Sequence, residues 1–247
     1  MPLAGVKCNS LTKRAEARII DNMAKRSKQQ AAEAIKVDPV EACAAFLPND
    51  KDALLAWAMD AMKVYHRAAM AGDEDAAASA WLTRDAVVWK LNGGTMWGSA
   101  AEEDSPSRVV ARHCSAAPGD VPTWGQEGEF LIETAGMRVL VEAGPGYGKG
   151  WAHFQFHAVD MAAPFLSETG YRSHFAAVMV GLTVDQASCK LVRHLVAEKK
   201  GRSLVEPRYR QGCEEFRAGR PWVSGAVTHQ GRSLVYEEED GQGAFAF

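Results

Sequence analysis

The apolar positions of the chain follow a helical spacing over its first third. Between residues 10 and 83 they recur about every four residues, which places them along one side of a helix. The turn-forming and capping residues between these stretches separate them into several elements. We predict a first helix from residue 10 and three more over residues 38–46, 54–72 and 73–82.

The pattern changes near residue 85, where short apolar runs separated by glycine and proline replace the helical spacing. Such runs are typical of strands. We predict strands over residues 86–91, 129–134, 137–143, 151–159 and 173–182, with shorter candidates at 201–205, 221–223 and 231–235. A short helix is expected near residues 108–113, and the capping and stop signals at Asp185 and Gly201 predict another helix between them.

These elements together predict an α+β fold. We expect a helical N-terminal region over residues 1–83, packed against an antiparallel sheet within residues 84–247 that also carries one helix in the C-terminal half. A chain of 247 residues is long enough to bury its own core without disulfide or metal staples.

The net charge of −3 is the sum of two unequal parts. Residues 1–36 hold eight basic and three acidic side chains, a net of +5, so the remainder carries −8. A basic helix on an acidic body indicates a polyanionic partner, an acidic protein surface, contact between the two parts, or a solvated helix face. The candidate partner-binding residues of this helix are Lys13, Arg14, Arg18, Lys25, Arg26 and Lys28.

Cysteine usage and hydropathy indicate where the protein resides. The five cysteines are scattered and odd in number, which favours reduced thiols. The sequence has no apolar run of 18 residues, and its N-terminus lacks the basic-then-apolar order of a signal peptide. We therefore expect a cytoplasmic protein that makes no contact with a membrane.

Few residues suggest catalytic or metal chemistry. His153 and His157 flank an alternating aromatic and polar segment, so a strand would place both imidazoles on one face about 13 Å apart, too far to share one ion. Phe154 and Phe156 would form the opposite, core face. Cys114 follows a histidine, and a Cys/His pair can supply a nucleophile and its base. We predict no catalytic residue, metal or cofactor from these patterns.

A second candidate binding site lies in the polar cluster before the strand at 173–182. It contains Glu168, Tyr171, Arg172 and His174 around a glycine suited to a tight turn. Tyrosine and arginine are enriched where proteins bind one another, and loops on a sheet often carry function. The alternative is a plain turn in which Glu168 pairs with Arg172.

Residues 88–97, Val-Trp-Lys-Leu-Asn-Gly-Gly-Thr-Met-Trp, resemble a motif of antirestriction proteins borne on conjugative plasmids. In that interpretation the segment is a strand, an Asn-Gly-Gly hairpin turn and an aromatic step. The resemblance covers about ten residues. It implies an accessory protein of a mobile element that blunts host defence without being an enzyme.

Three functional hypotheses account for these features. The first is a non-enzymatic counter-defence protein that inhibits a host nucleic-acid-targeting complex, either a CRISPR ribonucleoprotein or a restriction system, with nucleic acid as a further partner of the basic helix. The second is a metal- or Cys/His-dependent hydrolase that uses His153, His157 or Cys114. The third is an accessory protein that binds DNA without sequence preference, for which the basic helix would neutralise phosphates.

Overall fold

The computed structural model describes residues 38–198, 202–226, 228 and 229. The described residues from Val40 onwards form one compact unit. The six basic residues predicted to bind a partner, Lys13 to Lys28, lie outside the described residues. All described helices and strands belong to this unit. The short helix at its start begins one residue earlier, at Pro39.

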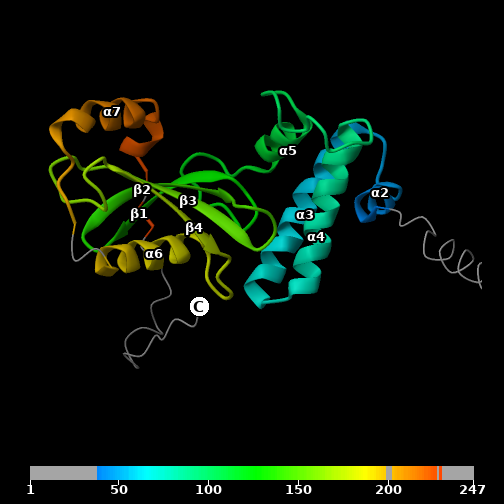
Figure 1. Ribbon diagram of the computed structural model, residues 1–247, viewed down its shortest axis with the longest axis horizontal. Coiled ribbons are helices and arrows are strands. Elements are labelled where there is room, and N and C mark those ends of the chain that lie inside the picture. Colours follow the sequence, from blue (N-terminus) through cyan, green and yellow to red (C-terminus); the bar gives the residue numbers. More distant parts are fainter. Residues whose placement is uncertain (1–37, 199–201, 227, 230–247) are drawn as a thin grey trace, which may run out of the picture. The chain divides into compact units, whose positions relative to one another are not determined.

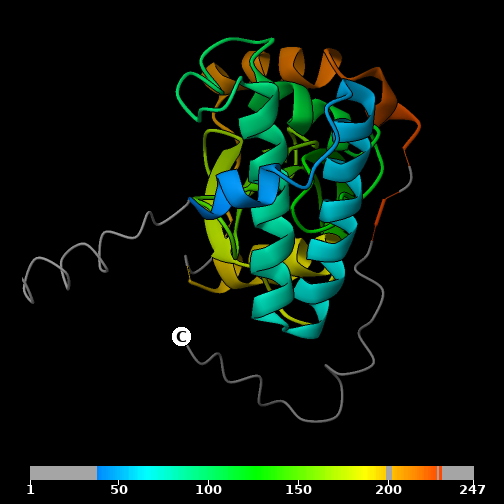
Figure 2. The same cartoon turned by 90° about the vertical axis from the view of Figure 1, so that its right-hand side faces the viewer.

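Two long helices form an antiparallel hairpin after the short helix α2 (Pro39–Ala44) (Figures 1 and 2). Helix α3 (Lys51–Ala71) begins where the carboxylate of Asp50 accepts a hydrogen bond from the backbone of Ala53, and it ends at Gly72 in the left-handed conformation. Helix α4 (Glu74–Leu91) is capped in the same way by Asp73. The predicted helices of this region are confirmed, with α4 longer than expected.

The strand predicted over residues 86–91 is wrong, because these residues are the last turns of α4. Ala86, Val87 and Val88 are fully buried. A helix enclosed on several sides produces a continuous apolar run that periodicity cannot distinguish from a buried strand. Helix α4 therefore runs through the predicted domain boundary at residues 83 and 84, and the division into two domains there stays a prediction.

The Asn-Gly-Gly turn is not a hairpin but the end of α4. The side-chain amide of Asn92 donates hydrogen bonds to the carbonyls of Thr95 at 2.7 Å and Trp97 at 2.9 Å. These bonds fix the loop that leads to α5 (Pro106–Cys114), where a short helix was predicted. The resemblance to antirestriction proteins supposed a strand and a hairpin over residues 88–97, so its structural basis is wrong.

Four strands form an antiparallel sheet in the order β1-β2-β3-β4. They are β1 (Gly128–Thr134), β2 (Met137–Pro145), β3 (Trp151–Ala158) and β4 (Tyr171–Ala177). The turn between β1 and β2 uses Ala135 and Gly136, both at positive φ, as tight hairpins require. This meander and the α+β class agree with the sequence prediction.

The two faces of the sheet carry different layers. On one face Phe130, Val141 and Phe156 lie side by side and are fully buried. Helix α6 (Val184–Glu198) covers this face through β1, and the same apolar core includes residues of α3 and α4. Figure 1 shows α6 and α7 on opposite sides of the sheet.

Helix α7 (Pro207–Ala218) and the 3-10 helix η1 (Pro221–Ser224) lie on the second face. They pack on a small apolar cluster that contains Leu131, Leu140 and Val223. The short strand predicted at residues 221–223 is wrong, because Pro221 opens a helical turn instead. Within the described part of the chain, no helix is long and apolar enough to cross a membrane.

Candidate functional site

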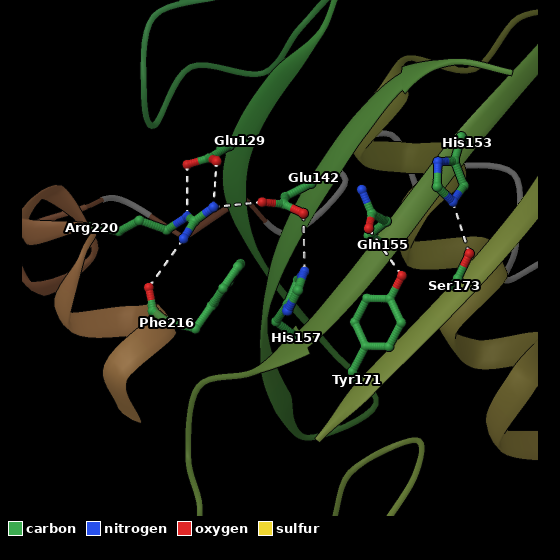
Figure 3. A network of polar contacts seen from close by, with 9 residues as sticks. All are labelled: Glu129, Glu142, His153, Gln155, His157, Tyr171, Ser173, Phe216 and Arg220. Carbon is green, nitrogen blue, oxygen red and sulfur yellow. Dashed lines mark hydrogen bonds and ion pairs between the residues drawn. The ribbon is translucent and has the colours of Figure 1, made fainter. Parts of the chain in front are cut away.

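The second face of the sheet carries a connected group of polar and aromatic side chains. Along β3, His153, Gln155 and His157 alternate with Phe154 and Phe156, which are fully buried on the opposite face. The predicted arrangement of the two histidines is therefore confirmed. We call this surface the polar face of the sheet (Figure 3).

Arg220 joins two carboxylates on this face. Glu129 of β1 and Glu142 of β2 are directly opposite each other in the strand register. The guanidinium donates to both carboxylate oxygens of Glu129 at 2.8 and 2.9 Å and to Glu142 at 2.6 Å. It also lies over the ring of Phe216, 3.7 Å from the ring centroid. Arg220 thereby neutralises a repulsive carboxylate pair and anchors the segment after α7 to the sheet (Figure 3).

His157 extends this network. Its Nε2 lies 3.2 Å from the second carboxylate oxygen of Glu142. Its ring stacks on Phe216 at a centroid distance of 4.0 Å and lies beside Tyr171. The hydrogen bond from His157 is the main cause that holds the pKa of Glu142 below its ordinary value, with Arg220 adding to the effect. These contacts are those of a structural ion cluster.

His153 has a separate set of partners. Its Nε2 lies 2.8 Å from the hydroxyl of Ser173, and its ring stacks almost parallel to Phe175 at 4.1 Å. Burial lowers its pKa, which favours the neutral ring. The described residues include no group of three or more His, Cys, Asp or Glu side chains that could hold a metal ion.

Cys114, the candidate nucleophile of the hydrolase hypothesis, is the last residue of α5 and is buried. Burial raises the pKa of its thiol. Nucleophilic attack requires the thiolate, so this environment favours the unreactive form. Its neighbour His113 is exposed to solvent.

The polar cluster predicted around Glu168, Tyr171, Arg172 and His174 does not lie together, because β4 places its residues on different faces of the sheet. Tyr171 lies on the polar face, where its hydroxyl donates to the side chain of Gln155 at 2.9 Å. Arg172 and His174 lie on the other face, opposite Phe156 and Phe154. The Nε of Arg172 is buried without a hydrogen-bond partner.

His174 and Glu168, the other members of this cluster, have surroundings that differ from those of Tyr171. Burial is the main cause that lowers the pKa of His174, and the positive charge of Arg172 adds to it. Glu168 is exposed in the loop before β4, where its backbone carbonyl accepts from Glu206. The four residues therefore do not form one site, and their role in binding a partner stays a prediction.

An open cavity of about 570 Å³ adjoins the polar face. Its walls include Glu127, Glu129, Glu142, His153 and Gln155. Glu127 and Glu129 are two residues apart in the sequence, which gives no sign that Glu142 and Arg220 would join them. No local signal indicates that Arg220, 91 residues from Glu129, would meet it.

The helical segment, residues 39–113 with helices α2 to α5, contains exposed cationic side chains. Residues 39–113 hold seven basic and eleven acidic side chains, a net of −4. Lys63 pairs with Asp60, and Arg112 pairs with two acids of the loop before α5. Arg67 and Arg108 are exposed, and neither forms an ion pair with another described residue.

Comparison with known proteins divides the chain into two matched segments. Residues 39–113 match the family described as the KlcB N-terminal DNA-binding domain, and residues 127–208 match the KlcB third domain. These ranges correspond to the helical segment α2–α5 and to the sheet with α6. No solved structure matches the chain.

Two relatives from Escherichia coli, both named Protein KlcB, are similar to most of the chain. One is 45% identical over 208 residues, which is 83% of this chain and 51% of the relative. The other is 48% identical over 174 residues, or 70% of this chain and 37% of the relative. The chain thus spans about half or less of the length of these relatives, and it matches the KlcB family through both its helical segment and its sheet.

Proposed function

We propose that the chain is a DNA-binding accessory protein that acts by binding rather than by catalysis. The observation that carries this proposal is the match of residues 39–113 to the KlcB N-terminal DNA-binding domain. This favours the third hypothesis from the sequence, DNA binding without sequence preference, over inhibition of a host defence complex. Membership of a mobile element, which the sequence suggested, remains part of the proposal.

The charge distribution indicates which residues would contact DNA. Because the matched segment has a net charge of −4, its surface as a whole repels phosphates. Contacts must then come from individual exposed cations, of which Arg67 on α3 and Arg108 on α5 are not held by carboxylates of the described residues. The basic residues 1–36, with a net charge of +5, would supply a further sequence-independent contribution.

The proposed binding role, without catalysis, is consistent with the state of the three groups named in the hydrolase hypothesis. His157 is engaged with Glu142, and His153 is engaged with Ser173. Burial disfavours the thiolate of Cys114. A binding protein needs none of these groups to be reactive.

Binding of a fluorescent 30-base-pair duplex at several salt concentrations tests the proposal. We expect the affinity to fall steeply as salt rises. In a plot of the logarithm of the binding constant against the logarithm of the salt concentration, each phosphate contact contributes about 0.9 to the slope, so each contact removed should make the slope shallower by about that amount. Arg67→Glu and Arg108→Glu should each weaken binding, and Lys13→Glu combined with Arg14→Glu and Arg18→Glu should weaken it further.

Arg208→Glu is the matched control, because Arg208 is an exposed arginine outside the helical segment. It should leave duplex affinity within about twofold, the change expected for a distant surface charge. Failure of the chain to bind duplex at low salt, or equal losses in all arginine variants, would overturn the proposal. A complex with a host defence protein that forms without DNA would support the counter-defence hypothesis instead.

A further inference from the structure

Three aromatic rings form a continuous stack at one end of the polar face. Tyr147 lies in the loop between β2 and β3, Phe175 on β4 and His153 on β3. The rings of Tyr147 and Phe175 are 4.4 Å apart, and those of Phe175 and His153 are 4.1 Å apart, with interplanar angles of 23° and 7°. The stack therefore rises from the sheet through Phe175 to Tyr147.

The outer ring of this stack is open. Tyr147 is 81% exposed although one side of its ring rests on Phe175. Its other side is thus available to a further flat ring, which would continue the stack at the same spacing. Aromatic rings gain about 1–3 kcal/mol from a stacked base in single-strand-binding proteins.

The loop that presents Tyr147 is fixed in place. The backbone N–H of Gly150 donates to the Tyr65 hydroxyl of α3 at 3.0 Å, and the Gly150 carbonyl accepts from Val178 at 2.9 Å. Gly148 and Gly150 have positive φ values of 99° and 80°, which glycine adopts without strain. The inner end of the stack is fixed by the His153–Ser173 contact (Figure 3). A preorganised ring loses little entropy when it binds a ligand.

A second exposed ring, that of Trp151, lies on the same face of β3 as His153. Trp151 precedes His153 by two residues, so the two lie about 7 Å apart along β3. Trp151 is 48% exposed. Lys149 is an exposed cation between Tyr147 and Trp151 in the sequence and can contact a phosphate. Two rings with a cation between them in the chain match successive nucleotides of a single strand better than one isolated ring.

We propose that the stack Tyr147–Phe175–His153, together with Trp151, binds the bases of single-stranded nucleic acid. The stack accepts one base on the open side of Tyr147, and Trp151 accepts a neighbouring base. Duplex DNA does not satisfy this site, because its bases are already stacked and paired within the helix. The rings of this site belong to the sheet and its β2–β3 loop, outside the helical segment proposed to contact duplex DNA, and α3 contributes only the Tyr65 hydroxyl that holds the loop.

Fluorescence anisotropy of a labelled 20-nucleotide oligothymidylate, titrated with the full chain, tests this inference. Oligothymidylate forms no internal pairs, so its bases are free to stack. Tyr147→Ala and Trp151→Ala should each lower the affinity about 5- to 150-fold, the effect of losing one base stack. Tyr147→Phe retains the ring and should bind within about twofold of the unchanged chain, since stacking does not need the hydroxyl.

Trp97→Ala is the matched control, because Trp97 is 90% exposed but lies in the loop after α4. It should leave oligothymidylate binding unchanged. Absence of single-strand binding, or equal affinities for the Tyr147→Ala, Trp151→Ala and Trp97→Ala variants, would overturn the inference. Competition by thymidine monophosphate as strong as that by the 20-mer would identify a free nucleotide as the ligand and would overturn the claim for a single strand.

The same variants separate this inference from the proposed function. If duplex binding fails while oligothymidylate binding depends on Tyr147, the helical segment does not bind DNA and the ring site stands. If duplex binding depends on Arg67 and Arg108 while Tyr147→Ala has no effect on either ligand, the proposed function stands and the ring site is refuted.

Discussion

The loss of Arg220 should destabilise the sheet, because its guanidinium neutralises two carboxylates at once. In Arg220→Met the hydrocarbon stem is retained, but Glu129 and Glu142 face each other across β1 and β2 without a cation. Removing one partner of a fully buried ion pair costs about 3–5 kcal/mol. The side chains here are 19–31% exposed, so we expect a smaller loss of about 2–3 kcal/mol.

Urea unfolding at pH 7, followed by circular dichroism, measures this loss. Arg138→Met is the control, because Arg138 also forms a two-bond ion pair, with Asp160, but both side chains are 40–49% exposed. An exposed pair contributes about 0–1 kcal/mol. The midpoint should therefore fall much further in Arg220→Met than in Arg138→Met, with little change of slope.

The pH dependence gives the reasoning a second test. Contacts with His157 and Arg220 lower the pKa of Glu142 in the folded chain, so their contribution is present above its ordinary pKa and is lost as pH falls through the lowered value. Without Arg220 the carboxyl group of Glu142 takes up its proton at higher pH, which removes its repulsion with Glu129. The deficit of Arg220→Met should thus shrink between pH 7 and pH 4, and adding Glu129→Gln and Glu142→Gln should recover part of the stability at pH 7. A deficit below about 0.5 kcal/mol at pH 7, the range of an ordinary surface substitution, or one that does not change with pH, would refute this account.

Three further predictions concern the packing of the unit. Gly170→Ala should destabilise the fold by at least about 1 kcal/mol more than Gly148→Ala in urea unfolding, because both positions have positive φ but only the Cβ at Gly170 would meet the Cys213 sulfur at 2.5 Å. Equal losses would show that the clash is relieved. Burial lowers the pKa of His66, whose Nδ1 accepts from the backbone of Trp124, so the unfolded chain binds the proton first and the free energy of unfolding should fall as pH drops below about 6.5. His66→Gln should flatten that dependence in urea titrations between pH 7 and 5, and an unchanged slope would contradict it. Burial raises the pKa of the Cys114 thiol, so mass spectrometry after alkylation of the native chain should find Cys114 modified more slowly than the half-buried Cys43, and equal rates would contradict it.

The sheet could be predicted from the sequence because its signal is local. Alternation along β3 separates His153 and His157 from Phe154 and Phe156, and the structure keeps that separation. The two-residue period of a strand would also have placed Tyr171 and Arg172 on opposite faces. Gly170 and Ser173 beside them favoured a turn instead, so the sequence did not predict a strand there. Once β4 is known to begin at Tyr171, alternate residues must lie on opposite faces.

Two other features depend on contacts that the local sequence does not describe. The end of α4 is buried from several sides, so Ala86, Val87 and Val88 show no polar positions that would mark a helix. The link between Arg220 and Glu129 joins positions 91 residues apart, and nothing in either neighbourhood specifies it. Such pairings are set by how α7 packs on the sheet, which only the folded chain reveals.

The charge of the chain also bears on how its two proposed nucleic-acid surfaces would differ. Phosphate contacts by Arg67, Arg108 and the basic residues before 37 weaken as salt rises, because they release condensed counterions. Stacking on Tyr147 and Trp151 involves uncharged rings, so this part of the affinity releases no counterions, whereas a phosphate contact by Lys149 does. Since residues 39–113 carry a net charge of −4, few such contacts are available within that segment. Affinity that persists at high salt would therefore come from base stacking on the rings of the sheet, and affinity that disappears would come from phosphate contacts, those of the helices and the basic residues that precede them together with that of Lys149.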